Sequence, residues 1–205
     1  MPTLSVAADA PAAIEAAVRA LLAGEAVVLP TETVYGVAAL PTVPGATARL
    51  FALKGRPQDV PLAVLVDDVE QAERLADFPP TARRLAERHW PGPLTLVLPR
   101  RADATALVLG GDPETIGIRC PDHDLVRAIA RRVGPIATTS ANRHGQPTPR
   151  AAAEAAAALA DGVAVLLDGG RCGGVPSTVV DATGEVLRVL RVGTISEAAL
   201  RAAQD

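Results

Sequence analysis

The chain has 205 residues, with 20 Lys and Arg against 23 Asp and Glu, so its formal net charge is −3. This length predicts one domain, and the balance of 49% hydrophobic and 21% charged residues is that of a folded globular protein rather than a disordered chain. Aromatic residues make up only 2% of the sequence, which argues against binding of single-stranded nucleic acid by rows of stacked bases.

Helices and strands alternate along the sequence. A first helix is marked by Asp9 as its cap, Pro11 in its first turn and Gly24 after its end, and an apolar strand at 26–30 follows. The same periodicities predict helices at 45–53, 68–77, 80–89, 122–133, 149–159 and from 196 onward, and strands at 62–66, 94–98, 115–120, 135–139, 163–167, 178–182 and 186–190. This alternation, without a linker between halves, predicts one α/β domain over 1–205 whose sheet is covered by helices.

The N-terminal segment does not resemble a signal peptide, because its first thirty residues contain Asp9 and Glu15 and lack a basic stretch. No apolar run approaches the ~18 residues of a membrane span, so we expect a cytoplasmic protein without membrane contact. Cys120 and Cys172 stand far apart, and the three histidines are scattered. We therefore expect neither a metal site nor a disulfide framework.

Lys54 is the only lysine in the chain, whereas arginine fills every other basic position. If Lys54-Gly-Arg56 is extended, both cationic side chains point to one side and form a clamp suited to a polyphosphate. A solvated charge pair just beyond a helix end is the alternative interpretation. Neither a Walker-type nor a Rossmann-type glycine motif is present, so any nucleotide site belongs to another class.

Polar groups follow several predicted strands, where ligands bind in open α/β sheets. Thr31, Thr33 and Tyr35 follow the strand at 26–30 and predict contact with a small polar substrate; threonines in an edge strand and a core tyrosine ring are the alternative. Thr139, Ser140 and Asn142 end the strand at 135–139, either as ligands or as a turn. Arg119 and Arg191 stand at ends of apolar strands, where a guanidinium usually meets an anion.

Six segments, in this order, closely resemble the YrdC-like L-threonylcarbamoyladenylate synthases, from about residue 10 to 195: Pro30–Gly36, Lys54–Pro57 with Pro61 and Leu62, Trp90–Thr95, Ile116–Arg119, Thr139–Asn142 and Pro176–Asp181. The resemblance implies a twisted mixed sheet covered by helices, as one domain of the short form, with a positively charged cavity. It also implies synthesis of threonylcarbamoyl-AMP from L-threonine, bicarbonate or CO2, and ATP, with release of pyrophosphate. Downstream tRNA threonylcarbamoyltransferase proteins would use the product to modify the adenosine beside the anticodon.

By motif position, the resemblance implies site residues in two groups. Lys54 and Arg56 would meet the ATP phosphates and carry the catalysis, with Ser140, Asn142 and Arg191 completing the nucleotide site. The threonine or carbamate would contact the remaining set, with Arg119 on its carboxylate: Thr31, Thr33, Tyr35, Arg119, Thr139 and Ser177. Mg²⁺ would be held mainly by phosphate oxygens and water.

Two other classes of function fit parts of this pattern. A non-catalytic RNA-binding protein of the same fold would use a basic cavity, but the net charge of −3 and the scarcity of aromatics oppose it. We therefore expect no strong direct binding of tRNA. A YrdC-like paralogue with another carbamoyl-adenylate chemistry, such as the hydrogenase-maturation step, is opposed by the length of the chain and by the motifs around Lys54 and Ser140.

Overall fold

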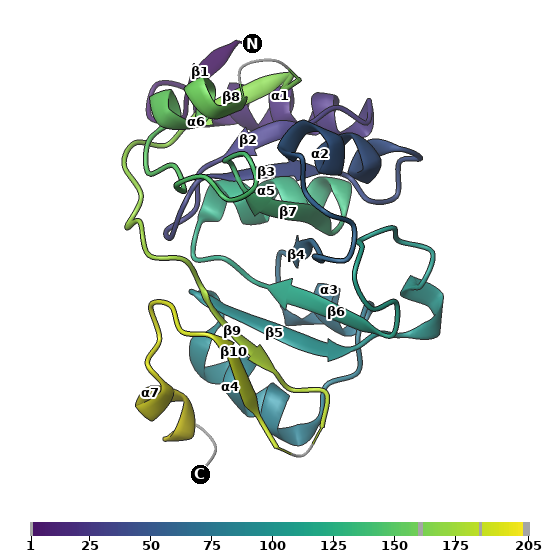
Figure 1. Cartoon of the computed structure of the whole chain (residues 1–205). Helices are drawn as coiled ribbons and strands as arrows, with labels where there is room; N and C mark the ends of the chain where they lie inside the picture. The colour runs from purple at the N-terminus through teal and green to yellow at the C-terminus, as the bar shows by residue number, and fades with distance from the viewer. Residues whose placement is uncertain (1, 160–161, 185, 203–205) are drawn as a thin grey trace.

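The computed structural model describes residues 2–159, 162–184 and 186–202. Within these residues a single ten-stranded sheet runs the length of the molecule, with helices packed against it (Figure 1). This arrangement confirms the predicted α/β fold. The strands are β1 (Thr3–Ser5), β2 (Val27–Leu29), β3 (Gly36–Ala39), β4 (Ala63–Leu65), β5 (Leu94–Pro99), β6 (Thr115–Arg119), β7 (Ile136–Ser140), β8 (Val165–Asp168), β9 (Thr178–Asp181) and β10 (Arg188–Arg191).

The helices are α1 (Ala10–Leu22), α2 (Ala46–Lys54), α3 (Val69–Glu73), α4 (Pro80–His89), α5 (Asp124–Val133), α6 (Ala152–Leu159) and α7 (Glu197–Arg201), with a short 3-10 turn η1 (Ala102–Ala104). The Asp9 side chain caps α1 as predicted, accepting a hydrogen bond of 2.9 Å from the Ala12 amide. No helix in the described ranges is both long and apolar enough to cross a bilayer.

The strand order is β1-β8-β2-β3-β7-β4-β6-β5-β9-β10. Among the described strands, only the β2/β3, β5/β6 and β9/β10 pairs join strands that are consecutive in the sequence. The β1/β8, β2/β8, β4/β6 and β5/β9 pairs are parallel, and the other pairs are antiparallel. Figure 1 shows the sheet descending from β1 and β8 near the N-terminus to β9 and β10 near the C-terminal helix. The sheet is therefore mixed, and its middle is occupied by β7, β4 and β6.

Two strands were not predicted from the sequence, and one is displaced. β1 is three residues long and only its middle residue is partly buried, so it carries no apolar signal. β3 (Gly36–Ala39) is buried along its whole length with small residues, which hides any alternation. The last strand is β10 at Arg188–Arg191 rather than 186–190, because it pairs with β9 through an irregular register.

At the β8-β2-β3-β7 end of the sheet, helices cover both faces. Residues such as Val27 and Leu29 pack with α1 and α5, whereas the intervening Val28 belongs to the core cluster that contains α2 and α6. Successive side chains of a strand point to opposite faces, so this division follows directly from strand geometry. The arrangement explains the continuous apolar sequence of β2.

The other half of the sheet is covered differently on its two faces. Val64, Ile118, Leu96 and Val180 stand in register across β4, β6, β5 and β9 and are fully buried, in the cluster that includes α3 and α4. The neighbouring row on the opposite face consists of small or short side chains. This second face carries the candidate functional site.

Candidate functional site

A cavity of about 370 Å³ lies on the second face of the central strands. Its floor is a row of paired residues, Thr138, Ala63, Gly117 and Val97, in register across β7, β4, β6 and β5. These short side chains leave the space that helices fill elsewhere. The volume falls within the range of roughly 300–1,000 Å³ typical of small-molecule sites.

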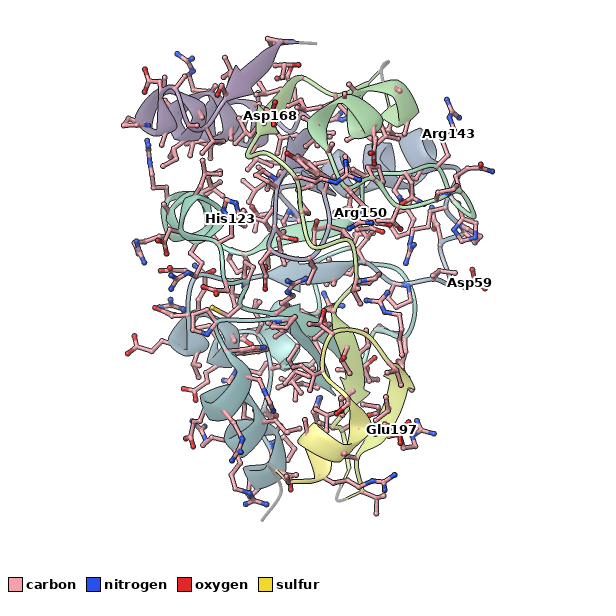
Figure 2. The ribbon with its side chains drawn as sticks, turned by 90° about the vertical axis from the view of Figure 1, so that its left-hand side faces the viewer. Asp59, His123, Arg143, Arg150, Asp168 and Glu197 are labelled. Carbon is pink, nitrogen blue, oxygen red and sulfur yellow. The ribbon has the colours of Figure 1, made fainter. Side chains whose placement is uncertain are left out.

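Loops from distant parts of the sequence form the walls of the cavity. Val60 and Pro61 come from the segment after α2, Thr148 from the segment before α6, and Pro176 from the segment before β9. Asp59 and Arg143, which belong to the first two of these segments, lie toward the same edge of the molecule in Figure 2. The site is thus assembled by loops on a rigid sheet, a common arrangement for ligand binding.

Three arginines line the cavity: Arg56, Arg119 and Arg191. Loss of solvation followed by the charge of Arg191 lowers the pKa of Arg56, and loss of solvation followed by the charge of Arg119 lowers the pKa of Arg191. Arg191 therefore lies within range of the charges of both Arg56 and Arg119. Since like charges gathered in a cavity are stabilised by a bound anion, this row is the principal electrostatic feature of the site.

Arg119, the last residue of β6, is held by three different partners. Its Nε donates to the Gly92 carbonyl at 3.1 Å, and one terminal nitrogen donates to Thr33 Oγ1 at 2.8 Å. The other terminal nitrogen pairs with Glu32 Oε1 at 2.6 Å. The anion that Arg119 meets in the structure is thus the Glu32 carboxylate. Arg119 also borders the cavity.

Arg191, at the end of β10, is fixed against the start of β9. It donates to the Ser177 carbonyl from Nε at 3.1 Å and from a terminal nitrogen at 2.9 Å, and to the Ser177 hydroxyl at 3.1 Å. That hydroxyl also lies 2.8 Å from Thr95 Oγ1. Arg191, Ser177 and Thr95 therefore form one hydrogen-bonded group on the cavity wall.

The position of Lys54 differs from the one predicted from the sequence. It was predicted as an extended loop residue beside Arg56, but it is the last residue of α2 and only 2% exposed. Its ammonium donates to the carbonyls of Ser140 and Asn142, below the cavity rather than on its surface. Gly55, with a left-handed φ of 61°, ends the helix directly after Lys54. Arg56 then turns to the cavity and donates to the Val60 and Pro61 carbonyls at 2.9 and 2.8 Å.

The two threonines of the 30–36 segment have different positions. Thr31 lines the cavity, and its hydroxyl donates to the Val34 carbonyl at 2.6 Å. The Thr33 hydroxyl lies 2.9 Å from Thr31 Oγ1 and supports Arg119 from behind the cavity wall. Thr31 therefore borders the cavity, whereas Thr33 lies behind the wall and holds Arg119.

Tyr35 does not reach the cavity. The residue is fully buried, and its hydroxyl donates to the Gly170 carbonyl at 2.6 Å beyond the end of β8. Burial raises the pKa of this phenol to about 12, so it stays protonated and serves as a donor. This placement corrects the expectation that Tyr35 contacts substrate and matches the alternative of a core ring.

The end of β7 contributes Thr139 and Ser140 to the cavity lining. Asn142, 6% exposed, does not line the cavity; its side-chain amide donates to the Arg143 and Gln146 carbonyls at 2.9 and 2.6 Å. It therefore shapes the turn that follows β7. Asn142 therefore belongs to a turn, as the alternative prediction had it, whereas Thr139 and Ser140 border the cavity.

Sequence reasoning missed several residues of the site. Thr95, Thr138 and Thr148 all line the cavity, and Glu32 pairs with Arg119. Thr95 was predicted only as the end of the Trp90–Thr95 segment. Its place between Leu94 and Leu96 in a strand puts its side chain on the face of the sheet opposite to these two leucines. Glu32 follows the strand at 26–30 together with Thr31 and Thr33, but no local pattern could predict its pairing with Arg119, which lies 87 positions further along the chain.

No aspartate or glutamate occurs among the described residues that line the cavity. Likewise, within 2–159, 162–184 and 186–202, no three His, Cys, Asp or Glu side chains come together in a way that could hold a metal ion. The donor set of this site is cationic and hydroxylic. It fits phosphates or carboxylates and does not fit a metal cage made by the protein.

Comparison with curated proteins finds relatives over most of the chain. It is 41% identical over 192 residues to the threonylcarbamoyl-AMP synthase of Bacillus subtilis, covering 92% of this chain but 56% of that protein. It is 39% identical over 176 residues to the threonylcarbamoyl-AMP synthase of Chromohalobacter salexigens, covering 84% of this chain and 94% of that protein. The chain thus spans little more than half of the first relative and nearly all of the second.

Solved structures agree with these similarities. The crystal structure of P. abyssi Sua5 complexed with L-threonine matches with a TM-score of 0.91 and 34% identity, over 99% of this chain and 61% of that one. E. coli YciO shares the fold, with a TM-score of 0.83 at 24% identity. The family model Sua5_yciO_yrdC, described as "Telomere recombination", matches residues 19–193. Since that model covers most of the sequence and a relative of similar length is 39% identical, the chain belongs to the Sua5/YciO/YrdC family.

Proposed function

We propose that this protein synthesises threonylcarbamoyl-AMP from L-threonine, bicarbonate or CO2, and ATP, and releases pyrophosphate. One observation carries the proposal: Arg56, Arg191 and Arg119 line one cavity of about 370 Å³, with Arg191 within range of the charges of the other two. Such a row suits a substrate pair with a triphosphate at one end and a carboxylate at the other. The names of the two curated synthases support the same reaction.

The triphosphate belongs at the Arg56 end, beside Ser140, and Arg191 lies between this end and the amino-acid end, where it contacts Ser177. The Lys54 ammonium lies beneath the triphosphate end, where it adds positive charge and fixes the backbone through the Ser140 and Asn142 carbonyls. Asn142 shapes the adjoining turn, so its contribution to nucleotide binding is through the backbone. This assignment keeps the predicted nucleotide residues together and gives Lys54 and Asn142 a supporting position.

The amino acid belongs at the Arg119 end, with Arg119 on its carboxylate. Thr31, Thr139 and Ser177 all line the cavity, and the Thr33 hydroxyl holds Arg119. Thr95 joins this group through its contact with Ser177. P. abyssi Sua5 has been crystallised in complex with L-threonine, and this relative therefore supports the choice of amino acid.

The chemistry needs little beyond orientation and charge neutralisation. The threonine amine adds to CO2 and loses a proton to give a carbamate. A carbamate oxygen attacks the α-phosphorus of ATP, and the bond to the pyrophosphate leaving group breaks. Both nucleophile and leaving group are anionic, so a cavity lined with arginines reduces their repulsion and stabilises the charge that develops on pyrophosphate. No protein nucleophile is required.

Magnesium would enter with the nucleotide as part of the substrate. Because no carboxylate lines the described cavity, the ion would be coordinated by phosphate oxygens and water rather than by side chains. Arg56 and Arg191 would bind the remaining phosphate oxygens. Their guanidinium groups are bidentate donors suited to this task.

The product contains an activated anhydride and must be consumed by an acyl-transfer reaction. We propose that downstream tRNA threonylcarbamoyltransferase proteins accept it and that these steps occur in the cytoplasm. Strong direct binding of tRNA by this chain is not part of the proposal, because its formal net charge is −3.

Pyrophosphate release by the purified protein tests the reaction. With ATP and Mg²⁺, release should require both L-threonine and bicarbonate and should proceed without tRNA, and threonylcarbamoyl-AMP should be found by mass spectrometry. L-Serine, which lacks the methyl group, should be a poorer substrate by about 1–3 kcal/mol of discrimination. Release that ignores threonine, or that depends strictly on tRNA, would overturn the proposed function.

A further inference from the structure

Arg119 carries a positive charge in a place that water hardly reaches, because its side chain is only 7% exposed. A charge buried in this way is costly unless an opposite charge balances it. The Gly92 carbonyl and the Thr33 hydroxyl satisfy two donors without supplying charge. Glu32, 2.6 Å from the remaining terminal nitrogen, supplies the negative charge.

Glu32 lies behind Arg119 with respect to the cavity. Arg119 and Thr31 border the cavity, whereas the intervening Glu32 does not appear among the residues that line it. The Glu32 carboxylate instead faces the start of α5, where its Oε1 accepts a hydrogen bond of 3.2 Å from the Asp122 amide. It also raises the pKa of His123, against the stronger lowering by burial. Figure 2 places His123 on the side of the molecule opposite Arg143.

The backbone around Glu32 is itself held in place. The Glu32 carbonyl accepts from the Gly173 amide at 3.2 Å, and the Thr33 carbonyl accepts from the Gly174 amide at 2.6 Å. A carboxylate on such a fixed backbone provides a defined anchoring point. A guanidinium bound to it cannot easily rotate, because the three contacts of Arg119 come from three directions.

The charge of Arg191 makes this anchor necessary. Arg119 contributes to the lowered pKa of Arg191, so the two cations repel each other across the cavity wall. The Glu32 carboxylate opposes this repulsion, together with the contacts of Arg119 to Gly92 and Thr33. With Glu32 in place, Arg119 stays at the wall and keeps one side toward the ligand.

We propose that Glu32 is a positioning residue, which holds the Arg119 guanidinium at the cavity so that it can bind the carboxylate of the amino-acid substrate. This inference rests on the proposed function, since it assigns the amino acid to the Arg119 end. Glu32 does not touch the substrate. It acts through Arg119 alone, and substitutions at the two positions should therefore not be independent.

Kinetics of Glu32 variants test the proposal. Glu32→Ala should raise KM for L-threonine by about 10- to 100-fold, because a guanidinium displaced by about 1 Å binds a carboxylate poorly. KM for ATP should change by less than about 3-fold, since the nucleotide end has its own arginines. Glu32→Gln keeps the size of the side chain but removes its charge, so it should raise KM for L-threonine nearly as much as Glu32→Ala, because Glu32 meets Arg119 as an ion pair.

Two comparisons separate positioning from general damage. The combined Glu32→Ala, Arg119→Ala variant should be no worse than Arg119→Ala alone, as expected when one residue acts only through the other. Glu15→Ala removes a carboxylate that pairs with Arg132 in the exposed α1–α5 contact, and it should leave both KM values unchanged. If Glu32→Ala does not fold, Glu32→Asp retracts the carboxylate by one methylene and should raise KM for L-threonine alone.

Calorimetric titration with L-threonine distinguishes failure of the positioning role from failure of the proposed function. If the unmodified protein binds no L-threonine, the proposed function fails. If it binds L-threonine and the Glu32→Ala variant binds it equally well, only the positioning role fails. An equal rise in both KM values, a Glu32→Gln variant with the KM of the unmodified protein, or a further loss in the combined variant would also overturn the positioning role.

Discussion

The Lys54 ammonium donates a hydrogen bond to the backbone carbonyl of Ser140, 86 positions further along the chain, and a second to the carbonyl of Asn142. The Lys54 carbonyl in turn accepts from the His144 amide at 2.9 Å. The end of α2 is thereby joined to the segment that follows β7. Ser140 lines the cavity, so this buried lysine sets the backbone of the nucleotide end as well as its charge.

Lys54→Ala should reduce both activity and stability. It removes the donor for two carbonyls below the cavity and leaves them unpaired, which costs about 1–3 kcal/mol for each buried group that water cannot reach. Pyrophosphate release should fall by at least about 100-fold, and the midpoint of urea unfolding should fall as well. An inactive variant with an unchanged unfolding midpoint would show that Lys54 acts through charge alone.

Arg56→Ala should reduce activity with little change in stability. Arg56 is half-buried, and its two hydrogen-bond acceptors, Val60 and Pro61, lie on a loop that water can reach once the guanidinium is removed. The loss should appear mainly in KM for ATP, because Arg56 borders the cavity at the proposed triphosphate end. Turnover close to that of the unmodified protein would refute the phosphate assignment.

The pH dependence of ATP use should report Lys54. Burial, followed by the charge of Arg56, lowers the pKa of Lys54 to about 8. Below this pH the ammonium is charged; above it the amine is neutral and supplies no charge to the phosphates, so kcat/KM for ATP should fall as pH rises through about 8. Bound phosphates favour the charged form, so kcat should persist to higher pH.

The Arg56→Ala variant supplies the control for this pH profile. It removes the second cause of the lowered pKa of Lys54, and the fall in kcat/KM should move to higher pH. Steady-state rates at limiting ATP between about pH 6.5 and 9.5 would test both expectations. A flat profile across that interval, or a fall at the same pH in both proteins, would contradict the assignment to Lys54.

The sequence was sufficient for those parts of the fold that depend on local pattern. Strands such as β5 (Leu94–Pro99) are apolar runs between turn signals, and α1 carries its own cap at Asp9, so both could be located without tertiary information. β1 and β3 could not, because β1 is mostly exposed and β3 consists of small residues. These two strands are defined by their partners β8, β2 and β7.

The site residues also fall into those that local sequence pattern predicts and those that depend on tertiary packing. Arg119 and Ser140 were predicted as site residues because each stands at the end of an apolar strand, where ligands bind in open α/β sheets. The burial of Lys54 was missed because it depends on where α2 docks against the end of β7, which no local pattern encodes. Tyr35 was misplaced for the converse reason: it follows a strand, but its ring enters the core toward Gly170.

The cysteines should be dispensable. Burial raises the pKa of Cys120 to about 11, and it also raises the pKa of Cys172, so both thiols stay protonated at neutral pH. Neither residue lines the cavity among the described residues. Replacing both with Ala should leave pyrophosphate release within about 3-fold of the original rate. Inactivation of a double variant with a normal melting curve would contradict this.

Gly193 should tolerate no side chain, for a reason that links it to Arg191 and Ser177. A Cβ at Gly193 would lie 2.2 Å from the Pro176 carbonyl oxygen and 2.5 Å from the Ser177 carbonyl carbon, and both are backbone atoms that cannot rotate away. Gly193→Ala must therefore separate the end of β10 from the start of β9. That separation breaks the hydrogen bonds of 3.1 and 2.9 Å between Arg191 and the Ser177 carbonyl, so two groups of the cavity wall move together.

Pyrophosphate release by Gly193→Ala should fall by at least about 10-fold, and its melting temperature should drop by several degrees, as expected when a core contact is overpacked. Gly184→Ala is the matched control, because a Cβ at Gly184 meets no atom within 4 Å. The control should keep both activity and stability. Equal behaviour of the two alanine variants would mean that the end of β10 moves freely against β9, and the tie between Arg191 and Ser177 would then not define the cavity wall.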